Sequence, residues 1–316
     1  MIDMLLTTKD FEQYYFYQSD LCSKDIIALD DTWTHSQVIK NLLSNVLSKL
    51  DEMALSCGIT KTVSQKVNVP IYERRIEKYT NWVDVLRLAN YQYGRFTEKK
   101  VSTTEGLYST LLALASTYSS GRDLKIGILG CGAGRSVLDF CRAYPFSTVY
   151  GLDYSITALC LADNILGNNI TSVNLVSRDV SSDDCISTVH EIIPFNLNNY
   201  KLGLWDIMNF DNTIQFDIIV CSNVLNLLPN QEIAIKNMAN TLTCGGLLIY
   251  ADLIGWRLDR KAQQKTLKSL QSIQKCFENI GFKTLELFKG GPYYEKESDE
   301  NGHLYLENFY VGLFKP

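Results

Sequence analysis

Three glycines at alternate positions follow a short apolar run in the stretch KIGILGCGAGRS. They are Gly130, Gly132 and Gly134, and Arg135 comes directly after them. Glycine inside an element costs about 0.5–1 kcal/mol relative to alanine, so three of them indicate that the backbone needs the space. A strand, a glycine turn and a helix in this order bring backbone N–H groups close to a ligand that a Cβ would exclude. The alternative is a tight turn with close helix–sheet packing.

A carboxylate stands where a nucleoside ligand would need one. The run STVYGLD predicts a second strand that ends in Asp153. It lies about 20 residues beyond Gly130, where a doubly wound fold places an acid that accepts hydrogen bonds from the ribose hydroxyls. A dinucleotide-binding loop would have glycine or alanine at its sixth position, where this chain has Arg135. The spacing therefore favours a nucleoside ligand other than NAD.

The pattern of the chain changes near residue 123. Before it, the apolar spacing predicts helices over 35–57 and 103–121 and one or two more over 72–94. After it, short β-rich runs alternate with helical stretches, which indicates βαβ units and a parallel sheet. We expect a helical N-terminal substrate or lid region over 1–122 and an α/β domain over 123–316.

Composition excludes several classes of protein. The 316 residues are 46% hydrophobic and 21% charged, which is typical of a globular chain, and the net charge of -5 argues against broad binding to nucleic-acid phosphates. The start lacks the pattern of a secretory signal and no run has the length of a membrane span, so we expect a cytoplasmic protein. Nine cysteines without CxxC spacing favour reduced, buried thiols, and three scattered histidines predict no metal site.

Four stretches resemble, in order, the motifs of class I methyltransferases that use S-adenosylmethionine (SAM). They are ILGCGAGRS, VYGLDYS, LWDIMNFDNTIQFDIIVCSNVLNLLP and LTCGGLLIYAD, and they cover roughly residues 124–252. The resemblance implies a doubly wound, mostly parallel seven-stranded sheet with an antiparallel last strand and helices on both faces. It also implies SAM as cofactor and S-adenosylhomocysteine (SAH) as product, with SAM lying across the strand ends.

The resemblance assigns cofactor contacts to residues after the first two strands. The glycine loop faces the methionyl part, Asp153 the ribose and Tyr154 the adenine. Ser222 and Asn223 end a later strand, where open α/β sheets place ligands, although Asn223 could equally cap the following helix. The expected set after these three strands is Gly130, Cys131, Gly132, Gly134, Arg135, Asp153, Tyr154, Ser222 and Asn223.

The acid that contacts the adenine amino group has two candidates. The family places an aspartate after its third strand, about a dozen residues before the FD that opens the fourth. This spacing favours Asp206, with Ile207 as the adjacent backbone contact, and makes residues 170–200 an insertion. Asp179, in the run VNLVSRDV, is nearer to Asp153 in the sequence and remains the alternative.

Residues for the methyl acceptor are less clearly marked. No side chain identifies itself as a general base, so the catalytic residue stays unknown. Aromatic and basic residues at an entrance can cover the cofactor and bind a cationic or planar substrate, or they can simply pack the helical region on the sheet. Stretch 289–306 is expected to form a loop or hairpin at the substrate mouth. The candidates in it and before the α/β domain are Tyr91, Tyr93, Arg95, Tyr293 and Tyr294.

The expected function is transfer of a methyl group from SAM to a small molecule, at a nitrogen atom. The segments GCGAGRS, GLDYS and SNVLNLLP are loosely similar to N-methyltransferases that act on histidine-derived imidazoles. Two alternatives are a methyltransferase acting on protein or RNA and a non-catalytic SAM-binding partner subunit. An open charged cleft would favour the first of these, whereas an enclosed aromatic pocket would favour a small molecule.

Overall fold

The structure is a computed structural model with long helices in its N-terminal part. It describes residues 2–6, 8–29, 36–59, 92–93, 103–119, 123–167, 172–176, 186–190, 197–209, 214–253, 270–297 and 303–316. The N-terminal helices are α1 (Thr8–Ala28), α2 (Ser36–Ser56) and α5 (Thr103–Tyr118). Those expected over 35–57 and 103–121 are confirmed. The stretch 72–94, where we expected one or two helices, lies outside the described residues except at 92–93, which are helical.

The α/β part is one sheet of eight strands. Their order is β1 (Ile2–Met4), β6 (Tyr200–Leu204), β3 (Thr148–Asp153), β2 (Lys125–Leu129), β7 (Phe216–Ser222), β8 (Leu242–Leu253), β10 (His303–Phe314) and β9 (Lys283–Glu297). Neighbours from β1 to β8 are parallel. The last strand, β10, is antiparallel to both β8 and β9. The doubly wound, mostly parallel sheet with an antiparallel last strand is thus confirmed.

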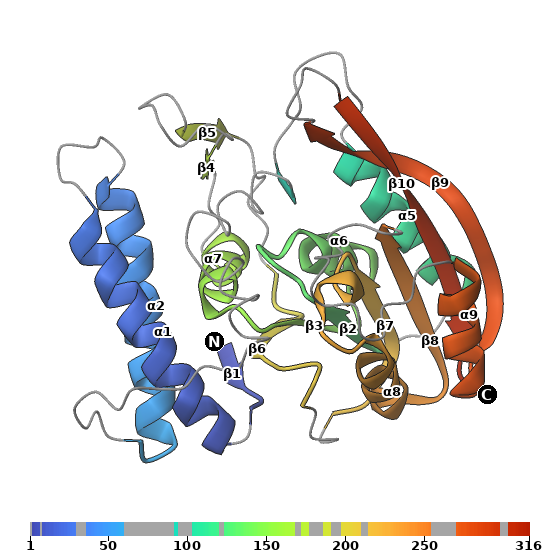
Figure 1. Ribbon diagram of the computed structural model, residues 1–316, viewed down its shortest axis with the longest axis horizontal. Coiled ribbons are helices and arrows are strands. Elements are labelled where there is room, and N and C mark those ends of the chain that lie inside the picture. Colours follow the sequence, from blue (N-terminus) through green and yellow to red (C-terminus); the bar gives the residue numbers. More distant parts are fainter. Residues whose placement is uncertain are drawn as a thin grey trace.

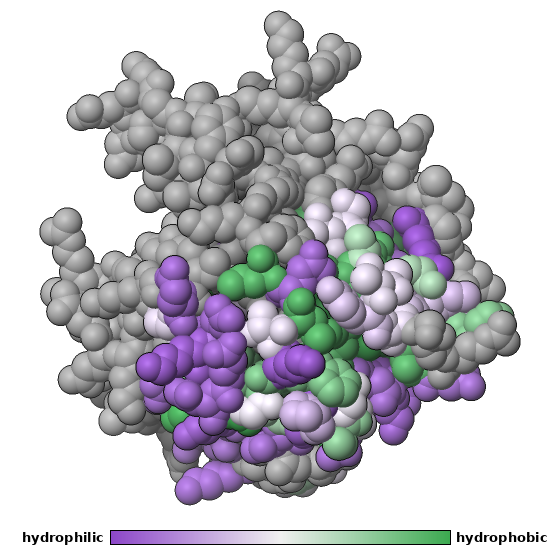
Figure 2. All heavy atoms as spheres, turned by 90° about the vertical axis from the view of Figure 1, so that its right-hand side faces the viewer, coloured by the Kyte–Doolittle hydropathy of each residue, from purple (hydrophilic) through white to green (hydrophobic). Residues whose placement is uncertain are grey.

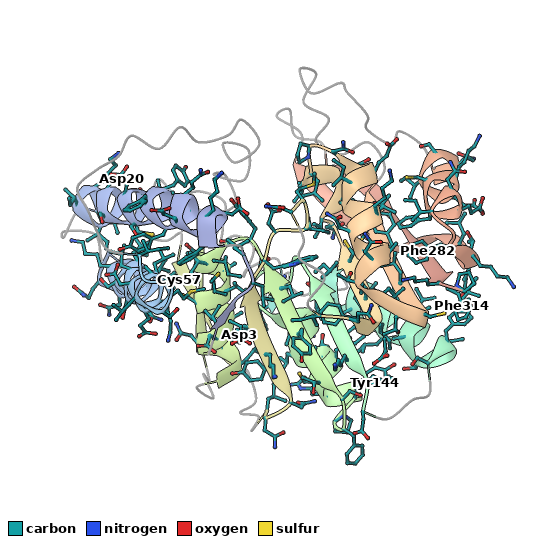
Figure 3. The ribbon with its side chains drawn as sticks, turned by 90° about the horizontal axis from the view of Figure 1, so that it is seen from below. Asp3, Asp20, Cys57, Tyr144, Phe282 and Phe314 are labelled. Carbon is teal, nitrogen blue, oxygen red and sulfur yellow. The ribbon has the colours of Figure 1, made fainter. Side chains whose placement is uncertain are left out.

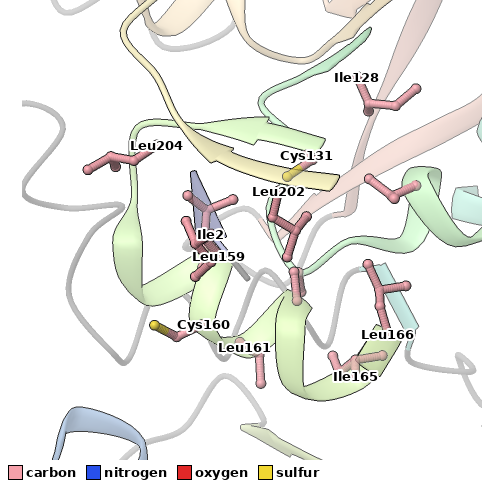
Figure 4. Packing of buried hydrophobic residues seen from close by; sticks show 14 of the residues in the cluster. Ile2, Ile128, Cys131, Leu159, Cys160, Leu161, Ile165, Leu166, Leu202 and Leu204 are labelled. Atoms are coloured by element: carbon pink, nitrogen blue, oxygen red, sulfur yellow. The ribbon is translucent and has the colours of Figure 1, made fainter. Parts of the chain in front are cut away.

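The eighth strand, β1, goes beyond the seven that we expected. It pairs in parallel with β6 in the register Ile2↔Leu202 and Met4↔Leu204. Figure 4 shows Ile2 next to Leu202 and to Leu159 of α7 (Ile156–Gly167), and all three side chains are buried. Three residues are too few to show the period of two that marks a strand in a sequence. The first residues therefore extend the sheet instead of belonging to a helical region.

Helices cover both faces of the sheet (Figure 1). Side chains of successive residues in a strand point to opposite faces. In β7, Ile218 and Val220 pack in the hydrophobic cluster that includes α5, α6 (Arg135–Ala143) and α7. Ile219 and Cys221 pack in a second cluster with α8 (Gln231–Thr241) and α9 (Leu270–Asn279). The strand is buried on both sides, as its continuous apolar run FDIIVCS predicts.

The hairpin of α1 and α2 lies beyond the β1 edge of the sheet (Figures 1 and 3). In α2, Leu43, Val46 and Leu50 are buried at helical spacing, so one stripe of the helix faces its neighbours. This helix packs against both α1 and α7. In Figure 3, Asp20 of α1 and Cys57 after α2 mark the hairpin, while Asp3 marks β1.

The expected insertion over 170–200 contains a small sheet of its own. Its strands are β4 (Ser172–Val176) and β5 (Ile186–His190), which pair antiparallel. The third strand of the main sheet, β6, begins only at Tyr200 and pairs with β3. The extra residues therefore precede the third strand.

We expected a loop or a hairpin over 289–306, and most of this stretch belongs to the β9–β10 hairpin. Tyr294 pairs with Leu306 in its register.

Figure 2 shows the side of the molecule on which α9 lies, where hydrophilic and hydrophobic residues are interspersed. Within the described ranges, none of the helices has both the length and the apolar character needed to cross a membrane.

Candidate functional site

The glycine loop connects β2 to α6 with a left-handed backbone at each glycine. The φ angles are +66° at Gly130, +56° at Gly132 and +88° at Gly134. Residues with a Cβ rarely adopt such angles. At Gly130 a Cβ would also lie 2.2 Å from Cγ2 of Val224, which follows β7. Backbone conformation and close packing thus require these glycines, and the loop keeps its peptide groups at the carboxyl edge of the sheet.

Asp153, the last residue of β3, joins this loop to the next one. Its Oδ2 accepts a hydrogen bond from the Gly132 N–H at 2.8 Å, and its Oδ1 accepts one from the Ser155 N–H at 2.8 Å. Burial raises the pKa of the carboxyl, while N–H groups of Ser155, Gly132 and Tyr154 act in the opposite direction. A carboxylate offers about four acceptor positions, so it retains room for a donor beyond these three N–H groups. A ribose hydroxyl is a donor of the required kind.

Gln92 and Tyr93 lie against the glycine loop from the helical part of the chain. The Gln92 amide Nε2 donates to the Cys131 carbonyl at 3.2 Å, and the Tyr93 hydroxyl donates to the Ala133 carbonyl at 3.0 Å. Gln92 is only 6% exposed, and its Oε1 has no hydrogen-bond partner among the described residues. A buried polar atom without a partner costs about 1–3 kcal/mol, which points to a donor on a ligand.

Arg135 and Tyr93, which we expected to contact cofactor and substrate respectively, contact each other. The Arg135 guanidinium carbon lies 5.9 Å from the Tyr93 ring centre and 5.7 Å from that of Tyr108 in α5. The Arg135 Nε donates to Asp139 at 2.8 Å. Because the guanidinium lies close to both rings, it holds the helical part of the chain against α6.

Cys131 turns its side chain towards the sheet. A Cβ on Gly151 of β3 would lie 3.2 Å from the Cys131 sulfur. Burial raises the pKa of this thiol well above its usual value, so the sulfur stays protonated. Its carbonyl accepts from Gly134 N–H as well as from Gln92. The residue shapes the loop and offers no thiolate nucleophile.

Asp206 follows β6 and is therefore the acid after the third strand. Its Oδ1 accepts from the Met208 N–H at 2.8 Å, and the residue is buried. The preceding Trp205 donates its backbone N–H to the Asp153 carbonyl at 2.9 Å, which ties the ends of β6 and β3 together. Ile207 is buried beside it, and its carbonyl accepts from Asn237 of α8. Asp179 lies outside the described residues.

Asn223, which comes directly after Ser222 at the end of β7, has a left-handed backbone with φ +56°. Its N–H donates to the Ala251 carbonyl at 2.8 Å, and its buried Oδ1 has no partner among the described residues. The alternative that Asn223 caps a helix is wrong, because Val224 holds the N-cap position of the short helix η2 (Leu225–Leu227) without a side-chain bond. Asn230 caps α8 instead. The Asn223 oxygen is thus available to a ligand at the strand end.

Asp252 is a further acid at the same edge that the sequence analysis did not single out. It is buried near the end of β8 and accepts a hydrogen bond from the Tyr250 hydroxyl at 2.9 Å. The signal for it in the sequence is an acid that ends the apolar run GLLIYAD.

The described structure does not place the remaining substrate candidates near the glycine loop and the strand-end acids. Tyr91 and Arg95 lie outside the described residues, and Tyr293 and Tyr294 are placed only by their backbone in β9. In the described part of the chain, no group of three or more His, Cys, Asp or Glu residues could hold a metal ion. Eight cysteines in that part are free thiols, five of them buried.

Comparison with known proteins gives one match to a protein family. Residues 128–248, which run from β2 to β8, match a family model described as a methyltransferase domain. This chain contains a methyltransferase domain. The match and the fold agree with the class I SAM-dependent methyltransferases that the four sequence motifs resemble. A search of curated proteins gave no match.

Solved structures share the fold at low identity. Magnesium protoporphyrin IX methyltransferase from Synechocystis PCC 6803, solved with SAM, matches 80% of this chain and 100% of its own at 14% identity, with a TM-score of 0.51. A phosphoethanolamine N-methyltransferase 2 from Haemonchus contortus matches 78% and 61% at 10% identity, with a TM-score of 0.51. The [4+2]-cyclase SpnF matches 78% and 97% at 12% identity, with a TM-score of 0.52. This fold thus carries more than one chemistry, and methyl transfer follows from the family match.

The residues of the site fit SAM as the cofactor. SAM carries a ribose, for which Asp153 has acceptor positions, and an α-ammonium group, which is a donor for the unpartnered Gln92 Oε1. Asp206 provides a buried carboxylate after the neighbouring strand β6, which is an acceptor of the kind that an adenine amino group needs. Gln92 was missed by the sequence analysis, although it stands between the two tyrosines that the analysis selected.

Proposed function

We propose that the protein transfers the methyl group of SAM to a nitrogen atom of a small molecule in the cytoplasm. The observation that carries this proposal is the buried, unpartnered Oδ1 of Asn223 at the end of β7. Val224, the next residue, packs on Gly130, so this oxygen belongs to the segment that adjoins the cofactor loop. A methyl acceptor with an N–H group has the donor that this oxygen needs.

The chain's own residues bind and orient the two reactants. SAM supplies a methyl group that is already strongly electrophilic. Asp153 holds the ribose, Asp206 the adenine amino group, and Gln92 the α-ammonium. Asn223 accepts a hydrogen bond from the acceptor and thereby directs its lone pair. Alignment of this kind can contribute about 7–11 kcal/mol without a general base.

Three observations favour a small acceptor over protein or RNA. Gln92 and Tyr93 are buried where they cover the glycine loop, so the methionyl side of the site is enclosed. The net charge of -5 disfavours a nucleic acid partner. The two methyltransferases of similar fold also act, by their names, on small molecules. We assign region 1–122 the role of shaping this enclosure.

The test is to incubate the protein with methyl-labelled SAM and a cell extract separated into low-mass and macromolecular fractions. We expect label in a low-mass product, whose fragmentation by mass spectrometry places the methyl group on nitrogen. Label in protein or RNA alone would support the macromolecular alternative. SAM binding without transfer to either fraction would favour a non-catalytic partner subunit.

Variants of Asn223 test the part assigned to its side chain. Asn223→Gly keeps the left-handed backbone and removes the amide, so label transfer to the low-mass fraction should fall about 10-fold or more while SAH affinity stays unchanged. Asn223→Asp keeps an oxygen acceptor and should retain more activity than the glycine variant. Full activity in Asn223→Gly would show that the residue serves only the turn.

A further inference from the structure

Helix α1 reaches the loop that follows Asp153. The hydroxyl of Tyr14 donates to the Tyr154 carbonyl at 2.7 Å and accepts from the Ile156 N–H at 3.0 Å. The Tyr14 ring meets the Tyr154 ring edge-on, with ring centres 5.0 Å apart. One hydroxyl therefore spans the backbone on both sides of Ser155, whose own N–H donates to Asp153.

The same helix contacts the loop that carries the second acid. Asp10, one turn before Tyr14, accepts a hydrogen bond from the Asn209 side chain at 2.6 Å. Asn209 ends the segment 205–209 that begins with Trp205 and contains Asp206. Helix α1 thus contacts both loops whose acids are assigned to the nucleoside half of SAM, although it is more than 100 residues away in the sequence.

We propose that α1 is a structural part of the nucleoside pocket and that Tyr14 is a positioning residue for it. Tyr14 acts through the backbone of residues 154–156, which it holds in the conformation that presents Asp153 and Tyr154. Since the coupling between two binding events is reciprocal, SAM or SAH bound in this pocket stabilises the docking of α1. This inference concerns cofactor binding and is independent of the identity of the methyl acceptor.

The chain offers a matched control on the same helix. Tyr15 is as buried as Tyr14, at 2% and 3% exposure, and its hydroxyl donates to Asp51 of α2 at 2.7 Å. Removing either hydroxyl deletes a hydrogen bond that α1 makes to another element. Of these two hydroxyls, only that of Tyr14 contacts a cofactor loop. If the hydroxyls only stabilise the fold, both variants should behave alike. If Tyr14 positions the loop, only its variant should bind SAH more weakly.

Calorimetric titration with SAH distinguishes the positioning role from a purely stabilising one. We expect Tyr14→Phe to lower SAH affinity about 5- to 30-fold, because the loop must be reordered on binding, and Tyr15→Phe to change it by less than about twofold. Equal affinities in the two variants would overturn the proposal. Titration of the unmodified protein shows separately whether the cofactor site itself is correctly assigned.

Hydrogen exchange provides a readout that a purely structural role would not change. SAH should slow amide exchange in α1 of the unmodified protein, and this protection should shrink in Tyr14→Phe but persist in Tyr15→Phe. Should Tyr14→Phe fail to fold, Asp10→Ala, which removes the exposed bond to Asn209, should reduce the same protection. Exchange in α1 that does not respond to SAH would contradict the coupling.

Discussion

Replacing Gln92 by leucine should leave the stability of the free protein nearly unchanged and weaken its cofactor binding. The substitution keeps the side-chain volume similar and removes the amide. It deletes the hydrogen bond from Nε2 to the Cys131 carbonyl at 3.2 Å, and that carbonyl still accepts from Gly134. It also deletes the side-chain hydrogen bond between Gln92 and Tyr108. It also deletes an unpartnered buried oxygen.

The two changes act in opposite directions on stability. Each lost hydrogen bond costs about 0.5–1.5 kcal/mol, whereas removing a buried oxygen without a partner regains about 1–3 kcal/mol. Since two hydrogen bonds are lost, these changes nearly cancel, and the free variant should melt close to the temperature of the unmodified protein. Binding should change far more, because a hydrogen bond to a charged ammonium contributes about 1.5–3 kcal/mol, or about 10- to 150-fold in affinity.

A pair of ligands makes the assay specific. SAH carries the α-ammonium group, whereas 5′-methylthioadenosine has the adenosine and the sulfur but no amino acid part. Isothermal titration of Gln92→Leu should show the loss for SAH and little change for 5′-methylthioadenosine. Equal losses for both ligands would mean that the substitution distorts the glycine loop. No loss for either would remove Gln92 from the site.

Three further predictions concern the cofactor residues. Gly132→Val places a branched side chain at φ +56° and should abolish SAH binding in a folded protein, as checked by titration and circular dichroism. Asp206→Ala should lower SAH affinity about 10- to 150-fold while Asp179→Ala changes it little, and the reverse would exchange their roles. Because burial raises the pKa of Asp153, acidification should protonate this carboxyl, and so lower SAH affinity, at a pH above the ordinary aspartate pKa of about 3.9. The stability of the free protein should instead rise on acidification over the same range, since the folded state binds that proton more tightly than the unfolded chain does. Asp153→Asn should remove the pH dependence of both SAH affinity and stability.

Local patterns in the sequence predict the sheet and its strand-end acids well. The run before Gly130, the acid that ends STVYGLD and the spacing from Asp206 to the next strand each depend on a few neighbouring residues. They predicted β2, β3 and the insertion before β6 in their places. The edge strand β1 was missed because three residues carry no period, and it forms only because Ile2 is buried against Leu202 and α7.

Contacts between distant segments account for what the sequence did not predict. Gln92 lies in an aromatic stretch, and its role in the site depends on a hydrogen bond from its side-chain amide to the carbonyl of Cys131, 39 residues further along. Tyr14 meets its partners 140 and 142 residues further along. Arg135 lies in the motif position where we expected a cofactor contact, but its guanidinium lies close to Tyr93 and Tyr108 of other segments. Such pairings follow from packing in three dimensions, which spacing along the chain does not encode.

The central claim is that the glycine loop, Gln92 and Asp153 form a site for SAM. Its most direct test is a calorimetric titration of the unmodified protein with SAH and, in parallel, with NAD. The account predicts saturable one-to-one binding of SAH and no heat of binding with NAD. Binding of NAD without any response to SAH would contradict it.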